Sequence, residues 1–378
     1  MGAYERDNFG DLLFYQLTKQ YLKEHRVIAS SIIAADMTEL LGARVLPYND
    51  LLSVRSWDAV WVVGGEIGGV DTGNALTMSL NDHDGEIFDR GTAQAREAIA
   101  RYLADASTSS PAYIPELNRF ALSASTPLIL NSVGLGTMRP SGTSTADDAA
   151  IAALQRSNSL VVRDSLSERF AATNHIPAKL SPDMVHAISL LYPDLAGTSD
   201  ATPQPYFLFQ ANGYIIGKYG AEQIARALAR VTDATGWRPV LFLAGTARHH
   251  DRAEQYDEVL RALRAFAPDA EPQVLSTRHP LELSQWIAQS QLWIGSSLHG
   301  RIISGSFGRP RLSLENSKVA TYAATWDTEF PVDVDFADLA SATEVAISAA
   351  ALSANREASR ELAEAANAMT QKLVKEYV

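Results

Sequence analysis

The chain has 378 residues, 32 Lys and Arg against 44 Asp and Glu, a formal net charge of −12, and 46% apolar residues. At about 150 residues per domain this length favours two domains, and the composition excludes disorder for most of the chain. The acidic balance and the lack of a Lys/Arg cluster argue against a nucleic-acid partner, and the absence of cysteine excludes disulfides, thiolate metal sites and a Cys nucleophile.

The N-terminal residues do not have the pattern of a signal peptide. Glu5 and Asp7 stand where positive charge is needed, and no segment reaches the roughly 18 apolar residues of a membrane span. We therefore expect a cytoplasmic protein without a transmembrane segment.

In the first half, short apolar runs alternate with Ala-rich helical stretches, which is typical of βα units with a parallel sheet. The predicted strands are Val27–Ile33, Ala43–Leu46, Ala59–Val63, Leu128–Val133 and Leu160–Arg163. The predicted helices are Gly10–Glu24, Ala93–Ala104, Ala146–Gln155 and Ser165–Ala172.

The second half repeats the alternation after a segment rich in Pro, Gly, Asp, Ser and Thr, Leu191–Pro205, which we interpret as a linker. The predicted strands are Tyr206–Gln210, Val240–Ala244, Gln273–Leu275, Leu292–Gly295 and Arg311–Leu314. The predicted helices are Gly220–Thr235, Arg252–Phe266, Leu281–Ser290, one from about Leu298, and Asn355–Tyr377.

These elements predict an α/β protein with two Rossmann-like, parallel-sheet domains that face each other across a cleft. The expected divisions are residues 1–190, a linker at 191–205, a second domain at 206–340, and C-terminal helices at 341–378 that pack back on the first domain. Open α/β sheets bind ligands at the carboxyl ends of their strands, so we expect the functional residues there.

The strongest local pattern is Gly295-Ser296-Ser297-Leu298-His299-Gly300-Arg301, which follows an apolar strand and opens a helix. Backbone N–H groups at such a helix start, with the serine hydroxyls and Arg301, can bind phosphate or carboxylate. His299 can exchange a proton near neutral pH. The alternative is that His299 packs the turn and the arginine is solvated.

Two patterns near the N-terminus also mark candidate residues. In Asn8-Phe9-Gly10-Asp11, an Asx residue caps the following helix, or a carboxylate fixed there acts as a general base. In Val63-Gly64-Gly65-Glu66, glycines end a buried strand and allow a ligand, or simply a turn, to approach closely.

Further strand ends complete the set. Arg163 is followed by Asp164 and Ser165, so that an Asp164 ion pair either orients Arg163 toward an anion or is structural. Gly134 follows another strand, and Ser181-Pro182-Asp183 forms a turn. The chain has no Walker motif, no G-x-G-x-x-G at the first strand, no G-x-S-x-G, and no zinc-ligand spacing. We expect no bound metal and no cofactor.

The ordered motifs N-F-G-D, V-V-G-G-E, S-V-G-L-G, V-V-R-D-S, S-P-D and S-S-L-H-G-R, followed by Lys318, resemble the polysaccharide pyruvyl transferase family over about residues 8 to 325. The resemblance implies a GT-B-like architecture and transfer of the enolpyruvyl unit of phosphoenolpyruvate onto two sugar hydroxyls as a cyclic ketal. It also implies a polymeric or lipid-linked acceptor at the cytoplasmic face of the membrane, with transient membrane contact.

On this resemblance His299 is the catalytic histidine and Asp11 accepts the proton of the attacking hydroxyl. The donor phosphate and carboxylate would be held by cations and by the helix start, namely Arg163, Ser296, Ser297, Arg301 and Lys318. The acceptor side of the cleft would include Asn8, Gly10, Gly64, Gly65, Glu66 and Gly134. Acceptor contacts are also expected from long loops at Asp71–Arg90 and Ala106–Ser125. The resemblance further implies a central strand before the N-F-G-D loop, where only Met1 to Arg6 stand.

Two other functions fit the same residues. A GT-B glycosyltransferase would place the diphosphate of a nucleotide sugar at the helix start. A non-catalytic carbohydrate-binding relative would keep the fold without the donor site, an alternative motivated by Ser297, where many members have Arg, and by the short start.

Overall fold

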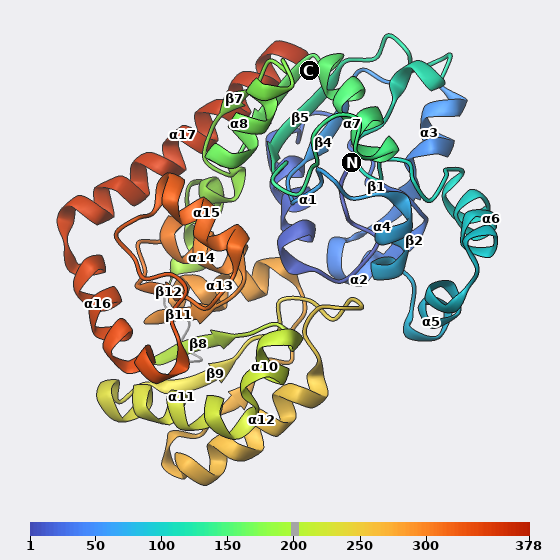
Figure 1. Ribbon diagram of the computed structural model, residues 1–378. Helices are drawn as coiled ribbons and strands as arrows, with labels where there is room; N and C mark the ends of the chain where they lie inside the picture. The colour runs from blue at the N-terminus through green and yellow to red at the C-terminus, as the bar shows by residue number, and fades with distance from the viewer. Residues whose placement is uncertain (198–203) are drawn as a thin grey trace. The chain divides into compact units, whose positions relative to one another are not determined.

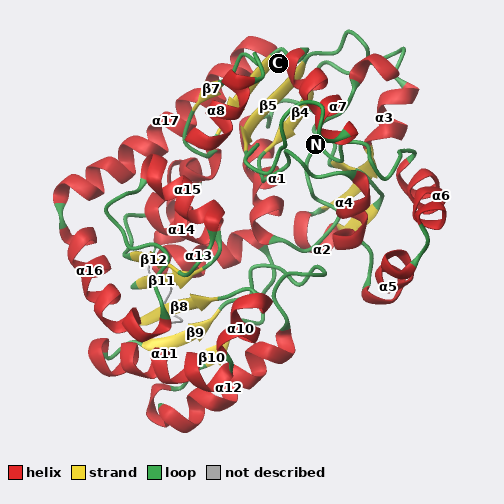
Figure 2. Cartoon of the chain, viewed as in Figure 1, coloured by secondary structure: helices red, strands yellow, loops and turns green. Residues whose placement is uncertain are grey.

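The computed structural model describes residues 1–197 and 204–378. The chain forms two compact units, Met1–Met184 with Ala366–Val378, and Val185–Ala365. Each unit is built on a parallel sheet with helices around it, so the expected α/β class with two parallel sheets is confirmed (Figures 1 and 2). Residues 198–203 of the predicted linker lie outside the described residues.

The larger sheet of the first unit has the order β4-β5-β6-β7, with every pair parallel. Its strands are β4 (Val60–Val63), β5 (Leu128–Val133), β6 (Ser159–Val162) and β7 (Lys179–Leu180). The first three are buried along their whole length, as strands covered on both faces should be. The predictions for these three are confirmed to within one residue at each end.

A smaller sheet of the first unit has the order β1-β3-β2, with β1 (Ser30–Ser31) parallel and β2 (Ala35–Met37) antiparallel to β3 (Ala43–Pro47). The predicted strand Val27–Ile33 is too long. Only its middle finds partners, because the Leu46 N–H donates to the Ala29 oxygen and the Gly2 N–H donates to the Ser30 oxygen. Strand β2 was not predicted.

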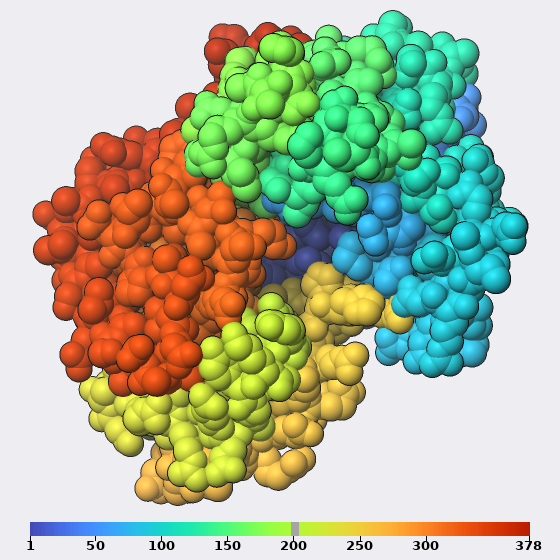
Figure 3. All heavy atoms as spheres, viewed as in Figure 1, coloured from blue at the N-terminus to red at the C-terminus, as the bar shows by residue number. Residues whose placement is uncertain are grey.

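The helices of the first unit include the four that the sequence predicts. They are α1 (Phe9–Tyr21), α2 (Thr38–Leu41), α3 (Tyr48–Val54), α4 (Thr72–Ser79), α5 (Asp82–Arg90), α6 (Ala93–Ala104), α7 (Thr145–Gln155) and α8 (Ser165–Thr173). The expectation of a loop at Asp71–Arg90 is wrong. Asp71 and Asn81 cap α4 and α5 through bonds from the Asn74 and Asp84 N–H groups, at 2.7 and 2.9 Å. Helices α5 and α6 lie at the surface of this unit (Figure 3).

The sheet of the second unit has the order β10-β9-β8-β11-β12 and is parallel throughout. Its strands are β8 (Tyr206–Gln210), β9 (Arg238–Leu241), β10 (Gln273–Val274), β11 (Leu292–Gly295) and β12 (Arg311–Ser313). Strand β9 begins and ends earlier than predicted, because it pairs with β8 from Arg238 to Leu241 and then leaves the sheet.

The helices of the second unit follow the predicted alternation. They are α9 (Ile188–Leu191), α10 (Gly213–Tyr219), α11 (Ala221–Thr235), α12 (Ala253–Phe266), α13 (Pro280–Gln289), α14 (Leu298–Ser306), α15 (Ser317–Trp326) and α16 (Leu339–Ala351). Helices α9, α10 and α15 were not predicted. In α10, Gly213 and Gly217 weaken the local helical signal, while Asn212 supplies the N-cap by accepting from the Ile215 N–H at 2.9 Å.

The last helix, α17 (Ser353–Tyr377), returns to the first unit with its final turns, as the sequence predicts. The Tyr21 hydroxyl donates to Asn367 Oδ1 at 2.8 Å, and Asn131 Nδ2 donates to Thr370 Oγ1 at 3.1 Å. These bonds tie the end of the chain to α1 and β5. Within residues 1–197 and 204–378, no single helix has the length and apolar character of a membrane span. The segments Phe336–Ala351 and Ser353–Tyr377, which meet at a bend of 77°, have that length and composition only when they are taken together.

Candidate functional site

The start of α1 places the first predicted residues. Asn8 caps the helix by accepting from the Gly10 N–H at 3.2 Å, so its predicted role as an N-cap is confirmed. Asp11 lies in the first turn with its side chain 13% exposed, and its Oδ2 is 3.8 Å from Arg6 Nη2. Asp11 therefore carries its carboxylate at the positive end of the α1 dipole, beside the Arg6 guanidinium.

Two glycines bring Asp11 to the carboxyl end of β4. Gly64 and Gly65 have φ of +60° and +75°, a conformation that favours glycine. A Cβ on Gly64 would lie 2.1 Å from the ring of Phe14, and one on Gly65 would lie 3.2 Å from Asp11 Oδ1. The glycine pair therefore lets α1 pack directly on the end of β4, beneath the Asp11 carboxylate.

A buried network missed by the sequence analysis lies behind Asp11. Arg6 Nη1 donates to Glu5 Oε1 at 2.6 Å and to the Tyr113 hydroxyl oxygen at 2.5 Å, and the Tyr113 hydroxyl donates to Glu5 at 2.8 Å. Ser79 and Ser31 also donate to the Glu5 carboxylate. The network fixes the guanidinium that faces Asp11. No local pattern could reveal it, since Tyr113 is 108 residues from Glu5 in the chain.

Three separate motifs of the first unit meet at one ion pair. Arg163, after β6, donates through Nη2 to Glu66 Oε2 at 3.1 Å, and Glu66 comes from the turn after β4. The pair lies over Gly134, after β5, where a Cβ would be 2.2 Å from Glu66 Oε2 and 2.9 Å from Arg163 Nη2. The strand-end placement of Gly134, Glu66 and Arg163 thus brings them together at the carboxyl edge of the sheet.

Arg163 has two more acidic neighbours. Its guanidinium is 3.8 Å from Asp164 and 3.6 Å from Asp183, and its side chain is only 3% exposed. Burial by itself lowers the pKa of Arg163, but Glu66, Asp183 and Asp164 outweigh it and raise the pKa above its ordinary value. Asp164 also caps α8 by accepting from the Ser167 N–H at 2.8 Å. Of the two interpretations of the Arg163–Asp164 pair, this arrangement favours the structural one.

In the second unit, the turn from β11 into α14 is held from both sides. The Ser296 N–H and hydroxyl both donate to Gln210 Oε1, at 3.1 and 3.2 Å, and Asn316 Nδ2 donates to the Ser296 carbonyl at 2.8 Å. Ser297 caps α14 by accepting from the Gly300 N–H at 3.4 Å. These bonds fix the shape of the turn and connect the ends of β8, β11 and β12.

His299 lies in the first turn of α14 and is 9% exposed. The following Gly300 packs on Trp293, since a Cβ there would lie 1.9 Å from the indole ring. This contact brings α14 close to β11 and fixes the helix turn that carries His299. The imidazole is thus positioned directly after the strand end, where the sequence predicts it.

Arg301 takes a different position from the one expected for a donor contact. Its side chain is 1% exposed, Nε donates to Asp327 Oδ2 at 2.8 Å, and its two terminal nitrogens donate to Ser313 and to the carbonyls of Pro331, Asp327 and Phe330. Those bonds occupy all five guanidinium N–H groups. Arg301 therefore holds the segment 327–331 against α14, and no N–H remains for a ligand.

Lys318 is exposed in the first turn of α15, and its backbone N–H donates to Asn316 Oδ1 at 3.0 Å. Asn316 in turn holds Ser296. The residues Ser296, Ser297, His299 and Lys318 therefore come from neighbouring strand ends of one sheet, whereas Arg301 points into the core of the unit.

Gln210 and Asp251 are polar residues of this edge that the sequence analysis missed. Gln210 Nε2 donates to both oxygens of Asp251 at 3.1 Å, and the Ala244 N–H donates to Asp251 Oδ2 at 2.6 Å. Burial raises the pKa of Asp251 to about 7. A strand that ends in Gln and is followed by Ala-Asn-Gly is the sequence signal that could have drawn attention to Gln210.

Basic side chains also lie at this edge of the sheet. Arg278 Nη1 donates to the Leu243 carbonyl at 2.5 Å, just after β9. Arg248 and His250 lie in the turn that ends at Asp251. The Asp251 N–H closes this turn by donating to the Gly245 carbonyl at 3.0 Å. In the described parts of the chain, no three His, Asp or Glu side chains form a group that could hold a metal ion.

Comparisons with known proteins were made by sequence and by structure. The model of a family described as polysaccharide pyruvyl transferase matches residues 8–318. A search of curated proteins found no significant match.

Similar solved structures include two enzymes described as UDP-GlcNAc 2-epimerases. The one from Neisseria meningitidis, bound to UDP-GlcNAc, has 12% identity and a TM-score of 0.46, over 67% of this chain and 71% of that one. The one from Methanocaldococcus jannaschii has 9% identity and a TM-score of 0.48, over the same shares. A structure of MnaA from S. aureus with UDP has 12% identity and a TM-score of 0.48, over 82% and 70%.

Proposed function

The chain belongs to the polysaccharide pyruvyl transferase family and is a transferase, and we propose that it moves the enolpyruvyl unit of phosphoenolpyruvate onto two hydroxyls of a sugar, with release of phosphate. The acceptor is a sugar of a polysaccharide or of its polymeric or lipid-linked precursor. The observation that carries the proposal is the position of His299, fixed in the first turn of α14 beside the serines that open that helix.

The second unit supplies the donor residues in this proposal. Phosphoenolpyruvate carries a phosphate and a carboxylate, which need cationic contacts. Lys318 and Arg278 supply positive charge at the strand ends, and the start of α14 at Ser296 and Ser297 adds the positive end of a helix dipole. Arg301 is left out of the donor contacts because its N–H groups are already used.

The first unit supplies the acceptor residues. Asp11 is held at its helix start by Arg6 and lies over Gly65, so a hydroxyl could approach the carboxylate across a position without a side chain. The neighbouring edge contains Glu66 and Gly134. In this proposal Arg163 is a positioning residue that fixes Glu66, rather than a direct donor contact.

The proposed reaction proceeds in two steps. His299 donates a proton to the methylene carbon C3, and the charge that develops at C2 is met by the oxygen of a sugar hydroxyl whose proton goes to Asp11. A C–O bond forms at C2 and the methylene becomes a methyl group. In the second step the C2–O bond to phosphate breaks, a second hydroxyl of the sugar closes the ketal, and its proton leaves with phosphate.

Ligand binding gives the first test of the donor. We expect phosphoenolpyruvate to raise the unfolding temperature of the protein, because a ligand that binds only the folded state stabilises it by mass action. Lys318→Ala, at an exposed position, should weaken this effect, whereas the exposed Lys372→Ala in α17 should not. Stabilisation by UDP- or GDP-sugars alone would instead favour the glycosyltransferase function.

A further inference from the structure

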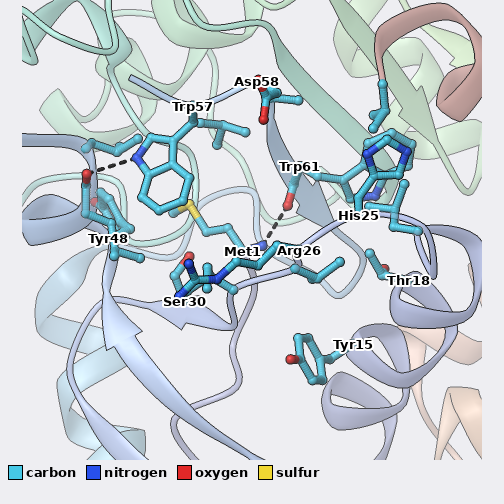
Figure 4. Close-up of a pocket in the computed structure, with 18 of the residues that line it drawn as sticks. Met1, Tyr15, Thr18, His25, Arg26, Ser30, Tyr48, Trp57, Asp58 and Trp61 are labelled. Atoms are coloured by element: carbon cyan, nitrogen blue, oxygen red, sulfur yellow. Dashed lines mark hydrogen bonds between the residues drawn. The ribbon is translucent and has the colours of Figure 1, made fainter. Parts of the chain in front are cut away.

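A cavity of about 230 Å³ lies in the first unit, and aromatic side chains line it, among them Tyr15, Trp57 and Trp61 (Figure 4). Strand β4 contributes its first residues to the wall, whereas Asp11 packs on Gly65, beyond the last residue of that strand. The cavity therefore lies toward the opposite end of β4 from the Asp11 carboxylate. In the second unit, by contrast, buried polar groups reach the proposed donor residues.

A chain of hydrogen bonds in the second unit crosses the ends of four adjacent strands, β9, β8, β11 and β12. Asp251, in the turn after β9, accepts from Gln210 Nε2 through both carboxylate oxygens, each at 3.1 Å. Gln210, the last residue of β8, accepts through Oε1 from the N–H and the hydroxyl of Ser296, at 3.1 and 3.2 Å. Asn316, after β12, donates through Nδ2 to the Ser296 carbonyl at 2.8 Å. Asp251, Gln210 and Ser296 are 6%, 2% and 3% exposed, so water competes little for these bonds.

Asp251 determines which way the Gln210 amide faces. A carboxylate can only accept hydrogen bonds, whereas an amide has one donating and one accepting end. Gln210 therefore turns its NH₂ group to Asp251, and its carbonyl oxygen faces Ser296. Asp251 is itself fixed by the Ala244 N–H, which donates to Oδ2 at 2.6 Å. Burial raises the pKa of Asp251 to about 7, and a protonated carboxyl still has an oxygen that accepts from Gln210.

Ser296 is bonded through all of its polar groups. Its N–H and O–H donate to Gln210, and its hydroxyl oxygen accepts from the Asn212 N–H at 3.3 Å. Its carbonyl accepts from Asn316. Both of its polar hydrogens are thus directed into the protein, and Ser296 shapes the turn instead of presenting a donor group to a ligand.

The next two residues present groups that can bind an anion. Ser297 caps α14 by accepting from the Gly300 N–H at 3.4 Å. This cap uses only the oxygen of the Ser297 hydroxyl, so its hydrogen can be donated to a ligand. The Leu298 N–H is among the first N–H groups of α14, which have no acceptor within a helix. The direction of both groups depends on the shape of the turn at Ser296.

We propose that Asp251 and Gln210 are positioning residues of the donor site, which act by holding Ser296. With Ser296 held, the Ser297 hydroxyl and the Leu298 N–H are aimed at one anionic group of phosphoenolpyruvate. The proposal rests on the proposed function, because its ligand is the donor of that reaction. It gives the two serines different roles, since Ser296 shapes the turn and Ser297 contacts the donor.

Two substitutions of Asp251 in the full chain test the positioning role. Asp251→Ala removes the acceptor of the Gln210 amide, whereas Asp251→Asn keeps an oxygen that can accept from it. Both variants remove the carboxylate charge, so a difference between them isolates the hydrogen bond. Asp251→Ala should exchange the Ser296 amide hydrogen about tenfold faster and raise the Kd of phosphoenolpyruvate in isothermal titration about tenfold, as the loss of a buried hydrogen bond implies. Asp251→Asn should match the unsubstituted protein in both measurements.

Thr343→Ala controls for a general loss of stability. Thr343 is fully buried in α16, and its hydroxyl donates to the Leu339 carbonyl at 2.9 Å. This variant should lower the urea midpoint of unfolding and leave the Ser296 exchange and the Kd unchanged. If Asp251→Ala does not fold, Gln210→Met breaks the same chain of bonds one residue further along and should give the same two changes.

Three results separate the possible outcomes. Unchanged Ser296 exchange in the variant that breaks the chain would overturn the hold on Ser296. Faster exchange with an unchanged Kd, or a Kd that rises equally in Thr343→Ala, would overturn the positioning of the donor site. If phosphoenolpyruvate does not bind the unsubstituted protein while Ser296 exchange follows the expected pattern, the proposed donor is wrong and the hold on Ser296 is supported.

Discussion

Glu66 and Arg163 form an ion pair at 3.1 Å although 97 residues separate them in the chain. They meet because β4, β5 and β6 are adjacent parallel strands whose carboxyl ends share one edge. The pair needs the absence of a side chain at Gly134, which ends the strand between them. This edge is where the proposed acceptor residues gather.

Gly134→Ala should separate the pair. The new methyl group would lie 2.2 Å from Glu66 Oε2, and neither partner can move without losing other bonds. We expect a loss of about 1–3 kcal/mol in the free energy of unfolding, typical of overpacking, measured by urea denaturation. Gly73→Ala in α4 is the matched control, because its nearest neighbours are at 3.4 Å. Equal stability of the two variants would contradict this account of Gly134.

Arg163→Met should cost more stability than Gly134→Ala. It leaves Glu66, Asp164 and Asp183 without their shared cation in a site that is almost fully buried. Breaking a buried pair in this way typically costs about 3–5 kcal/mol. The exposed pair Arg360–Glu357 of α17 provides the control, since Arg360→Met should change the unfolding free energy by less than about 1 kcal/mol. Similar losses in both variants would show that Arg163 has no special structural role.

The sequence predicted the main sheet strands and the long helices well, because their apolar runs and periodicity are local properties. The prediction of strand Val27–Ile33 was too long because strand length depends on partners, which here are Gly2 and Leu46. Helices α4 and α5 were missed although Asp71 and Asn81 are good capping residues, since both are short, α4 has the weak helix formers Gly73 and Asn74 in its first turn, and α5 is mostly polar.

For the candidate site, the sequence indicated at which strand ends the residues lie, but not which residues their side chains contact. Glu66, Gly134 and Arg163 lie at strand ends as predicted, and parallel strands bring those ends to one edge, but the sequence analysis assigned Arg163 to the donor and Glu66 and Gly134 to the acceptor and did not foresee their ion pair. The partners of Arg301 could not be foreseen. They are mostly backbone carbonyls of residues 327–331. Every residue has such a carbonyl, so the amino-acid type does not identify the ones that will accept from Arg301.

Asp251 should make stability depend on pH. Burial raises its pKa from 3.8 to about 7 in the folded state, so between these values the folded protein binds the proton more tightly than the unfolded chain. Asp251 therefore adds a few kcal/mol to the free energy of unfolding. This stabilisation is fully present below about pH 4 and is lost as the pH rises through 7. Asp251→Asn should lack this loss. Denaturation of the unsubstituted protein and of Asp251→Asn from pH 4 to 8 gives the difference in unfolding free energy at each pH. If this difference is the same at every pH, Asp251 is not the group that makes stability depend on pH.

Arg6→Met should impair turnover through Asp11. Removal of the guanidinium 3.8 Å from Asp11 takes away the cation that holds its charge and orientation. If Asp11 is the proton acceptor, the acid limb of the pH–rate profile should move upward in the variant, because the loss of a nearby cation raises a carboxylate's pKa. A purely structural role for Arg6 would lower activity without moving that limb.

The central claim is the transfer of the pyruvyl group with His299 as the proton donor. Phosphoenolpyruvate labelled with a heavy carbon isotope at C2 is incubated with a panel of glycan precursors, and the labelled ketal and the released phosphate are followed by NMR. We predict that ketal and phosphate form in equal amounts only when an acceptor is present. We also predict that His299→Ala lowers the rate about 10²-fold or more, while the exposed His83→Ala does not. Near-normal turnover by His299→Ala would remove that histidine from the mechanism, and turnover of nucleotide sugars alone would contradict the pyruvyl transfer itself.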